Sequence, residues 1–224
     1  MTLTDRYFGL QDRIAQAAQA AGRSPRELTV LAVSKRHADA SVQALADLGH
    51  RDFGENQVQA WSARLDAFPA LRWHLVGALQ TNKATAIEEG RPTLVHTVDR
   101  LKLVVALSRR WNHPTPLDVL IQVNVDDEPQ KAGCTPEGLD ALADHVTKST
   151  ALRLRGLMCI PKPVDGGAPR EAFARTRGLL ETIGDRVEDT PILSMGMSDD
   201  FEAAIAEGST LIRIGTALFG PRAD

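Results

Sequence analysis

The sequence predicts an α/β fold, a single (β/α)8 TIM-type barrel with an additional N-terminal helix. Short apolar segments rich in β-branched residues alternate with helical patterns, and eight such strand segments follow one another along the 224 residues. A chain of this length can bury the core of one such barrel. Since no shift in composition marks a boundary, we expect residues 1–224 to form one domain.

The elements are expected in a regular order. An alanine-rich helix from about Thr4 to Ala21 opens the chain and ends at Gly22. Strands are expected at 28–35, 51–55, 72–77, 93–99, 117–125, 152–160, 192–196 and 210–220. Helical patterns lie between them at 38–49, 56–68, 100–111, 136–149, 170–184 and 199–208. Since no helical pattern follows the last strand, the opening helix is expected to cover that gap, and the Pro- and Gly-rich loop 161–169 is the one expected flexible insertion.

Composition and charge exclude several classes of function. The formal charge is −3 and the basic residues are scattered, which indicates neither a nucleic-acid partner nor an anionic membrane. No apolar stretch is long enough to cross a bilayer, and no signal peptide is evident, so we expect a cytoplasmic protein. Cys134 and Cys159 lie in different segments, and no two histidines have the spacing of metal ligands. We therefore expect neither a disulfide framework nor a metal site.

A lysine ends the first predicted strand, in the segment LTVLAVSK at 28–35. Such an apolar run is typical of an interior strand of a parallel sheet, which would place the Lys35 amine at the mouth of the core. Desolvation there favours the neutral amine, which can attack a carbonyl and hold it as a Schiff base. The alternative is a solvated loop lysine, because lysine is rarely buried.

Other unusual residues fall at the same ends of later strands. The segment 195–200 leads from a strand into a helix, where backbone N–H groups and the Ser198 hydroxyl suit a phosphate, although Ser198 or Asp199 could simply cap that helix. It lacks the second glycine of a serine-hydrolase elbow. Arg213 stands in an apolar strand and needs an acceptor, either a neighbouring carboxylate or a ligand's ring nitrogen or phosphate. Gly215, two residues on, leaves space for close approach to the backbone.

Eight short motifs resemble one known family. They are LAVSK at 31–35, FGENQVQ at 53–59, WHLVGALQTNK at 73–83, HTVDR at 96–100, IQVN at 121–124, RGLMCIP at 155–161, MGMSDDFEAAIAEGST at 195–210 and RIGTALFG at 213–220. The sequence resembles the pyridoxal phosphate homeostasis protein family, which shares its barrel with the N-terminal domain of alanine racemase. Two departures are Ala78, where the family often has proline, and Met195, where leucine is usual.

The resemblance implies a site for pyridoxal 5′-phosphate. Lys35 would form the internal aldimine, and Arg213 would face the pyridine nitrogen. The remaining cofactor-binding residues implied are Asn56 beside the ring, Met197, and the phosphate-binding Ser198, Gly215 and Thr216. An arginine at the ring nitrogen leaves that nitrogen unprotonated and makes the cofactor a poorer electron sink.

The leading hypothesis is a carrier and regulator of the cofactor, without catalytic residues, that influences vitamin B6 and amino-acid balance. The only tyrosine, Tyr7, lies in the opening helix, and the sequence ends at Asp224 directly after the eighth strand, so we expect no second domain with a tyrosine base. The first alternative is an amino-acid racemase that uses Cys159 or His74 as its second base. The second is a Schiff-base aldolase acting on a sugar phosphate without the cofactor. We expect a monomer whose partners are the cofactor and apo forms of enzymes that use it.

Overall fold

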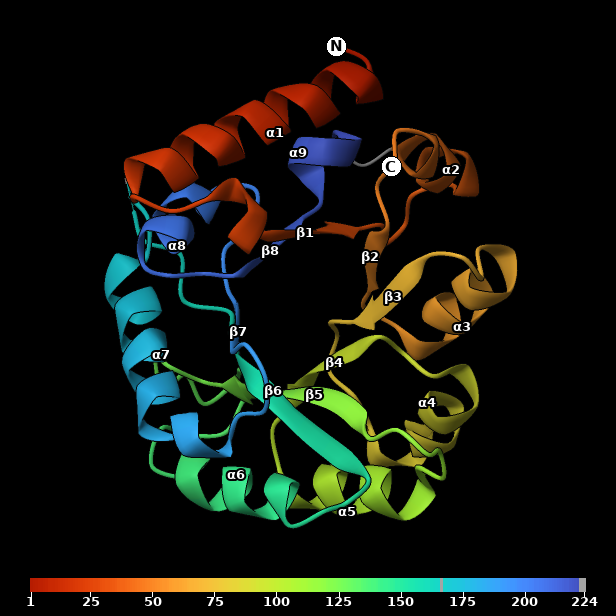
Figure 1. The fold of residues 1–224 in the computed structure, drawn as a ribbon, viewed down its shortest axis with the longest axis vertical. Helices are drawn as coiled ribbons and strands as arrows, with labels where there is room; N and C mark the ends of the chain where they lie inside the picture. The colour runs from red at the N-terminus through yellow and green to blue at the C-terminus, as the bar shows by residue number, and fades with distance from the viewer. Residues whose placement is uncertain (166, 222–224) are drawn as a thin grey trace.

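Eight parallel strands close into a barrel in the order in which they occur along the chain, as Figure 1 shows for the computed structural model. The structure describes residues 1–165 and 167–221. The barrel closes because β1 pairs with β8 as well as with β2. The strands are β1 Thr29–Val33, β2 Asp52–Glu55, β3 Arg72–Leu75, β4 Leu94–Val98, β5 Leu117–Val123, β6 Leu152–Cys159, β7 Ile192–Ser194 and β8 Leu211–Ile214. The predicted TIM-type barrel is confirmed.

Helices surround the barrel, and most of them connect successive strands. They are α1 Leu3–Ala20, α2 Asp39–Asp47, α3 Val58–Ala67, α4 Ala84–Gly90, α5 Leu101–Arg110, α6 Leu139–Thr147, α7 Arg170–Thr182, α8 Phe201–Ala206 and α9 Thr216–Phe219. Short 3₁₀ turns occur at Pro25–Glu27, Thr81–Lys83 and Gly184–Arg186. The helix α4 was not among the predicted ranges, because the segment ATAIEEG is too short to show a clear helical period.

The prediction of a last strand over 210–220 was wrong in its second half. The strand β8 ends at Ile214, and the chain turns at Gly215 into the short helix α9. The apolar residues Ala217, Leu218 and Phe219 continue the apolar run of the strand, so the composition hides the change of structure. The expectation that no helix follows the last strand was therefore also wrong. Part of the predicted 161–169 insertion, Gly166, lies outside the described residues.

Alternate residues of each strand face two different cores. One set fills the barrel interior and includes Leu31, Val76, Leu120, Met158 and Leu211. The other set packs outward against the helices and forms the larger core around Trp61, Trp73 and Phe173. Polar side chains also lie inside the barrel, because Arg213 follows Leu211 by two residues and so shares its face.

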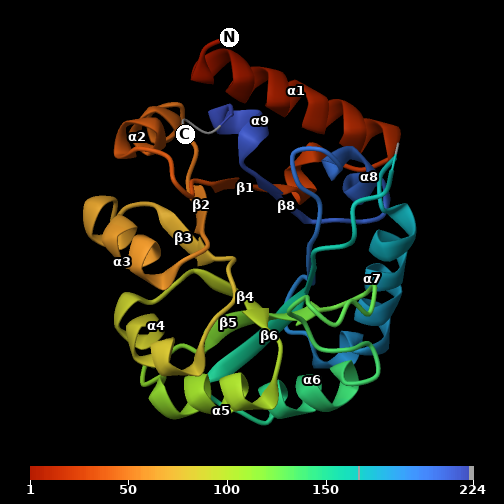
Figure 2. The same ribbon diagram turned by 180° about the vertical axis from the view of Figure 1, so that it is seen from behind.

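The opening helix α1 lies across α8 and α9, where Figures 1 and 2 show it from both sides. Its first turn is stabilised by a capping box between Thr2 and Asp5. The Arg6 guanidinium donates to the carbonyl oxygens of Leu218 (2.7 Å) and Phe219 (3.1 Å) in α9. The expectation that this helix covers a gap after the last strand was therefore wrong, because α9 occupies that place and α1 packs over α8 and α9.

Candidate functional site

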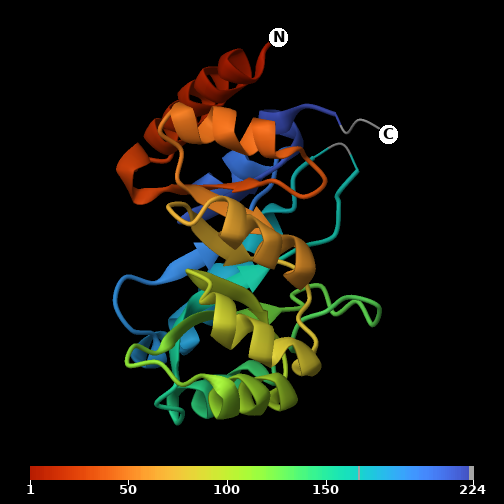
Figure 3. The same ribbon diagram turned by 90° about the vertical axis from the view of Figure 1, so that its right-hand side faces the viewer.

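A cavity of about 250 Å³ lies where the strands end at the mouth of the barrel. Residues at or directly after the ends of six strands, β1, β2, β3, β6, β7 and β8, supply its walls. Figure 3 shows the loops after β5 and β6 on one side of the molecule. The lining residues are Val33, Lys35, Asn56, Val76, Ile160, Met197, Ser198, Asp199, Arg213, Gly215 and Thr216. The carboxyl ends of the strands are where barrels of this type carry their chemistry.

All seven residues predicted to bind the cofactor line this one cavity, although they are spread from Lys35 to Thr216. Sequence reasoning missed Val33, Val76, Ile160 and Asp199 as lining residues. Val33 and Val76 could have been found from strand alternation, since each lies two residues beyond a position that faces the interior. Ile160 and Asp199 carried no signal beyond adjacency to predicted elements.

Lys35 lies in the turn that follows β1, two residues after its last strand residue Val33. The turn is fixed by its neighbours. The Ser34 backbone N–H donates to the Gly54 carbonyl (3.1 Å), and the Ser34 hydroxyl donates to Glu55 Oε1 (2.7 Å). Burial raises the pKa of the Glu55 carboxyl, and the hydrogen bond from Ser34 acts in the opposite direction. A buried carboxyl next to the lysine turn therefore holds the backbone that carries Lys35.

Arg213 is buried and makes three hydrogen bonds across the barrel. Its Nη1 donates to the Ser194 carbonyl (2.6 Å) and hydroxyl (2.8 Å), and its Nη2 donates to the Cys159 carbonyl (2.9 Å). The structure thus satisfies the guanidinium with carbonyls and a hydroxyl and not with the carboxylate considered as one alternative. Burial lowers the pKa of Arg213. Within the described residues, these bonds leave donor capacity on Nε and Nη2 for a ligand in the cavity.

Ser198 holds the start of α9 and does not cap α8. Its hydroxyl accepts a hydrogen bond from the Ala217 backbone N–H (3.2 Å), whereas the Asp200 carboxylate accepts from the Met197 N–H (2.6 Å) before α8. A Cβ at Gly215 would meet only the Val33 carbonyl oxygen at 3.6 Å. Packing within the described protein therefore leaves free space beside this backbone. The loops after β7 and β8 present hydroxyl and N–H groups to one end of the cavity.

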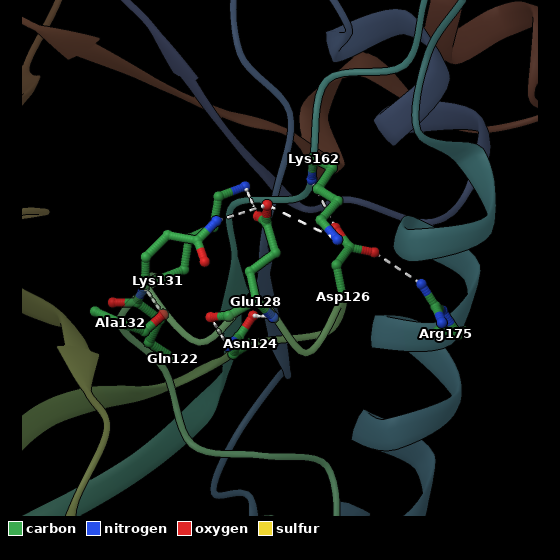
Figure 4. Close-up of polar contacts among 9 residues, drawn as sticks. Gln122, Asn124, Asp126, Glu128, Lys131, Ala132, Lys162 and Arg175 are labelled. Atoms are coloured by element: carbon green, nitrogen blue, oxygen red, sulfur yellow. Dashed lines mark hydrogen bonds and ion pairs between the residues drawn. The ribbon is translucent and has the colours of Figure 1, made fainter.

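A polar cluster links the loops that follow β5 and β6 (Figure 4). The carboxylate of Asp126 accepts from the Lys162 backbone N–H (2.6 Å) and from Arg175 Nη2 (2.8 Å). The loop that contains Asp126 is closed on itself, since Asn124 and Glu128 exchange two hydrogen bonds. These contacts fix the start of the 161–169 loop, directly after the lining residue Ile160.

Comparison with known proteins identifies the family. A family model described as the alanine racemase N-terminal domain matches residues 9–223. A pyridoxal phosphate homeostasis protein of Pseudomonas aeruginosa is 48% identical over 99% of this chain and 96% of its own length. One from Escherichia coli K12 is 42% identical over 95% of this chain and 94% of its own length.

The chain belongs to the pyridoxal phosphate homeostasis protein family.

A similar solved structure is that of PipY of Synechococcus elongatus with pyridoxal phosphate bound. It is 34% identical, covers 92% of this chain and 100% of its own, and superposes with a TM-score of 0.78. The residues that line the cavity of the present chain fit pyridoxal phosphate. They combine a lysine amine, a cation with unused donors, and hydroxyl and N–H groups at the end formed by the loops after β7 and β8. These match an aldehyde, a ring acceptor and a phosphate.

The two candidate second bases lie away from this cavity. Cys159 faces the outer core, and burial raises the pKa of its thiol to about 11. His74 lies inside the barrel and contacts His96. Neither lines the cavity, and Tyr7 packs edge-on against Phe8 and His50 in the region of α1.

Among residues 1–165 and 167–221, no helix has the length and apolar character needed to cross a membrane. The same residues contain no cluster of three or more His, Cys, Asp or Glu side chains arranged to hold a metal ion.

Proposed function

We propose that this protein binds pyridoxal 5′-phosphate in the cavity at the barrel mouth, carries it covalently on Lys35, and delivers it within the cell. The single observation that supports this most is the shared cavity of Lys35, Arg213 and the loops after β7 and β8. Family membership supports the cofactor and its homeostasis as the biological role. When bound, the group supplies an aldehyde and an electron-withdrawing ring.

Each part of the cavity has a defined task under this proposal. Lys35 supplies the amine, Arg213 faces the ring nitrogen, and Asn56 lies beside the ring. Ser198, Gly215 and Thr216 bind the phosphate through hydroxyl and backbone N–H groups, with Met197 in the same loop. Because a guanidinium stays protonated, the ring nitrogen beside it stays unprotonated, which weakens the ring as an electron sink.

The racemase alternative requires a second base opposite the lysine. Since Cys159 and His74 lie outside the cavity lining, the described residues offer neither of them for that task. We therefore propose a carrier of the cofactor, active as one barrel domain, whose partners include apo forms of enzymes that use it. The sugar-phosphate aldolase would use the same lysine but would bind no coloured cofactor.

The visible spectrum of the purified protein tests this function. We expect a band from the covalently held cofactor that borohydride abolishes, with mass mapping of the reduced adduct to Lys35. A colourless protein that does not take up the cofactor when it is added would favour the aldolase. Reduction that labels only other lysines would show that the cavity has been assigned wrongly.

A further inference from the structure

A continuous line of polar side chains crosses the interior of the barrel and ends at Arg213. It connects strands on opposite sides of the barrel, β2, β3 and β4 on one side and β7 and β8 on the other (Figure 1). The imidazoles of His74 and His96 and the hydroxyl of Ser194 are buried. The members in order are Asp52, His74, His96, Ser194 and Arg213.

The distances along this line are those of hydrogen bonds, except at its far end. Arg213 Nη1 is 2.8 Å from Ser194 Oγ, which is 2.9 Å from His96 Nδ1. His96 Nε2 is 3.0 Å from His74 Nδ1. His74 Nε2 is 3.5 Å from Asp52 Oδ1, an ion-pair distance, and it makes no hydrogen bond to any of the described residues. Burying a polar group costs free energy unless it is paired, so each side chain in the line needs its neighbour as a hydrogen-bond partner.

The far end of the line lies at the start of β2, where Asp52 is also paired with Arg72 through two hydrogen bonds of 2.7 and 2.5 Å. Burial alone would raise the pKa of Asp52, but contacts with His74 and Arg72 lower it below its ordinary value. Asp52 is therefore a carboxylate at neutral pH. A fixed negative charge stands at one end of the line and a fixed positive charge at the other.

These two charges determine where the hydrogens lie. Arg213 can only donate, so the Ser194 oxygen accepts from it, and the Ser194 hydroxyl hydrogen remains available for His96 Nδ1 once Asp52 fixes the direction from the other end. The hydrogen of His96 then sits on Nε2 and is donated to His74 Nδ1. His74 in turn carries its hydrogen on Nε2, facing the Asp52 carboxylate. With neutral rings, the reverse direction would place a bare nitrogen of His74 opposite that carboxylate.

We propose that Ser194 and His96 are positioning residues for Arg213, and that Asp52 sets the direction of all the hydrogen bonds between them. The line holds one edge of the guanidinium, so the other edge stays directed at the cavity. A change at Asp52 should therefore alter the dissociation rate of pyridoxal phosphate bound at the other end of this line. This inference rests on the proposed function, because the ligand of the free edge is the pyridine ring of the cofactor.

The hydrogen positions can be measured without the cofactor. In protein labelled with ¹⁵N at histidine, the ring-nitrogen shifts at pH 8 distinguish the two neutral tautomers. We expect both His74 and His96 to carry hydrogen on Nε2 in the cofactor-free protein. A hydrogen on Nδ1 of His96 would overturn the proposed direction.

Three variants test the effect on the cofactor. Asp52→Asn keeps the shape but removes the charge, and we expect a mixture of tautomers at His74 and His96 and at least threefold faster loss of bound pyridoxal phosphate on dilution. Ser194→Ala should also speed this loss, while Arg213 keeps its bond to the Ser194 carbonyl. Arg72→Gln breaks the same exposed ion pair and is the matched control, with tautomers and dissociation rate unchanged. Far-UV circular dichroism confirms that each variant is folded.

The outcomes separate this inference from the proposed function. Wild-type tautomers and wild-type dissociation rates in both Asp52→Asn and Ser194→Ala would overturn the inference, while borohydride trapping on Lys35 would still support the proposed function. If wild-type protein bound no pyridoxal phosphate, the proposed function would fail, and with it the claim that the line acts on the cofactor.

Discussion

Arg213 and Ser194 are joined by two hydrogen bonds, one to the backbone carbonyl (2.6 Å) and one to the hydroxyl (2.8 Å) of the serine. This double contact links the last two strands of the barrel inside its core. The cation therefore has a structural task as well as its proposed task at the cofactor. Replacing it tests both tasks, and the variants must separate them.

Arg213→Lys keeps a cation but cannot reach Ser194 and Cys159 together, so buried carbonyls lose their donors. We expect the free energy of unfolding to fall by about 1–3 kcal/mol, measured in urea, with the spectrum of bound cofactor retained. Arg213→Glu should in addition protonate the ring nitrogen and shift the absorption band. A folded Arg213→Glu protein with an unaltered band would contradict the ring contact.

Lys35→Ala should abolish covalent attachment of the cofactor while changing stability by no more than about 0.5 kcal/mol, because a half-buried mouth residue contributes little to the core. Borohydride reduction followed by peptide mass mapping measures the first effect, and urea denaturation measures the second. Lys102→Ala, at an exposed position of α5, is the matched control and should label at Lys35 like the wild type. Trapping on Lys83 alone would refute the assignment.

The phosphate should supply much of the affinity, because charge-assisted bonds to the loops after β7 and β8 form only with it. Pyridoxal without the phosphate should bind more than about tenfold more weakly, or more than about 1.4 kcal/mol, in equilibrium titrations followed by absorbance. Ser198→Ala should reduce the difference in affinity between pyridoxal phosphate and pyridoxal. The variant removes a hydroxyl at the proposed phosphate site, and it also removes the acceptor for the Ala217 backbone N–H. Equal affinities for the two compounds would place the phosphate in solvent.

Stability should fall as the pH drops below about 6.5. Burial lowers the pKa of both His50 and His96 from the ordinary value of 6.5. Below pH 6.5 these two histidines therefore bind more protons in the unfolded chain than in the folded protein. The stabilising contribution is full above pH 6.5 and is lost below it, by up to about 1.4 kcal/mol per pH unit for each histidine. Urea denaturation between pH 7.5 and pH 5 measures the slope. His50→Gln should remove the contribution of His50 to the pH dependence of the free energy of unfolding. An unchanged slope in that variant would contradict the lowered pKa of His50.

The loaded protein should transfer its cofactor and leave amino acids unchanged. Incubation with an apo enzyme that requires pyridoxal phosphate should restore that enzyme's activity, whereas alanine and serine should keep their chirality and their α-hydrogen in deuterated water. The reason is that Cys159 and His74, the candidate second bases, lie outside the cavity. Rapid α-hydrogen exchange that depends on Lys35 would favour the racemase instead.

Much of the barrel was predictable, because strands buried on both faces are apolar and β-branched, as in the segment around Val30 and Leu31. The helix α9 was not, because Leu218 and Phe219 resemble a continued strand and only the backbone turn at Gly215 separates them. Lys35 and Arg213 could be singled out as charges in apolar strands. Their neighbours in the cavity came largely from the family resemblance.

The polar line through the barrel could not be predicted from the sequence. His74 and His96 are 22 residues apart, and Ser194 is 98 residues from His96, so only closure of the barrel brings them into contact. No sequence pattern distinguishes these residues, because a single histidine or serine in a strand does not indicate which distant residue it will contact. What determines the contact is the placement of strands that are far apart in the sequence, which no single segment reveals.

The pairing of β1 with β8 also sets when the protein can acquire its ligand during synthesis. The first strand leaves the ribosome early but must wait for nearly the whole chain before its second neighbour emerges, and α1 must wait for α8 and α9. The cavity takes residues from the first and the last strand of the barrel, between Val33 and Thr216. The cavity therefore cannot be complete before β8 and the Gly215-Thr216 turn have been synthesised.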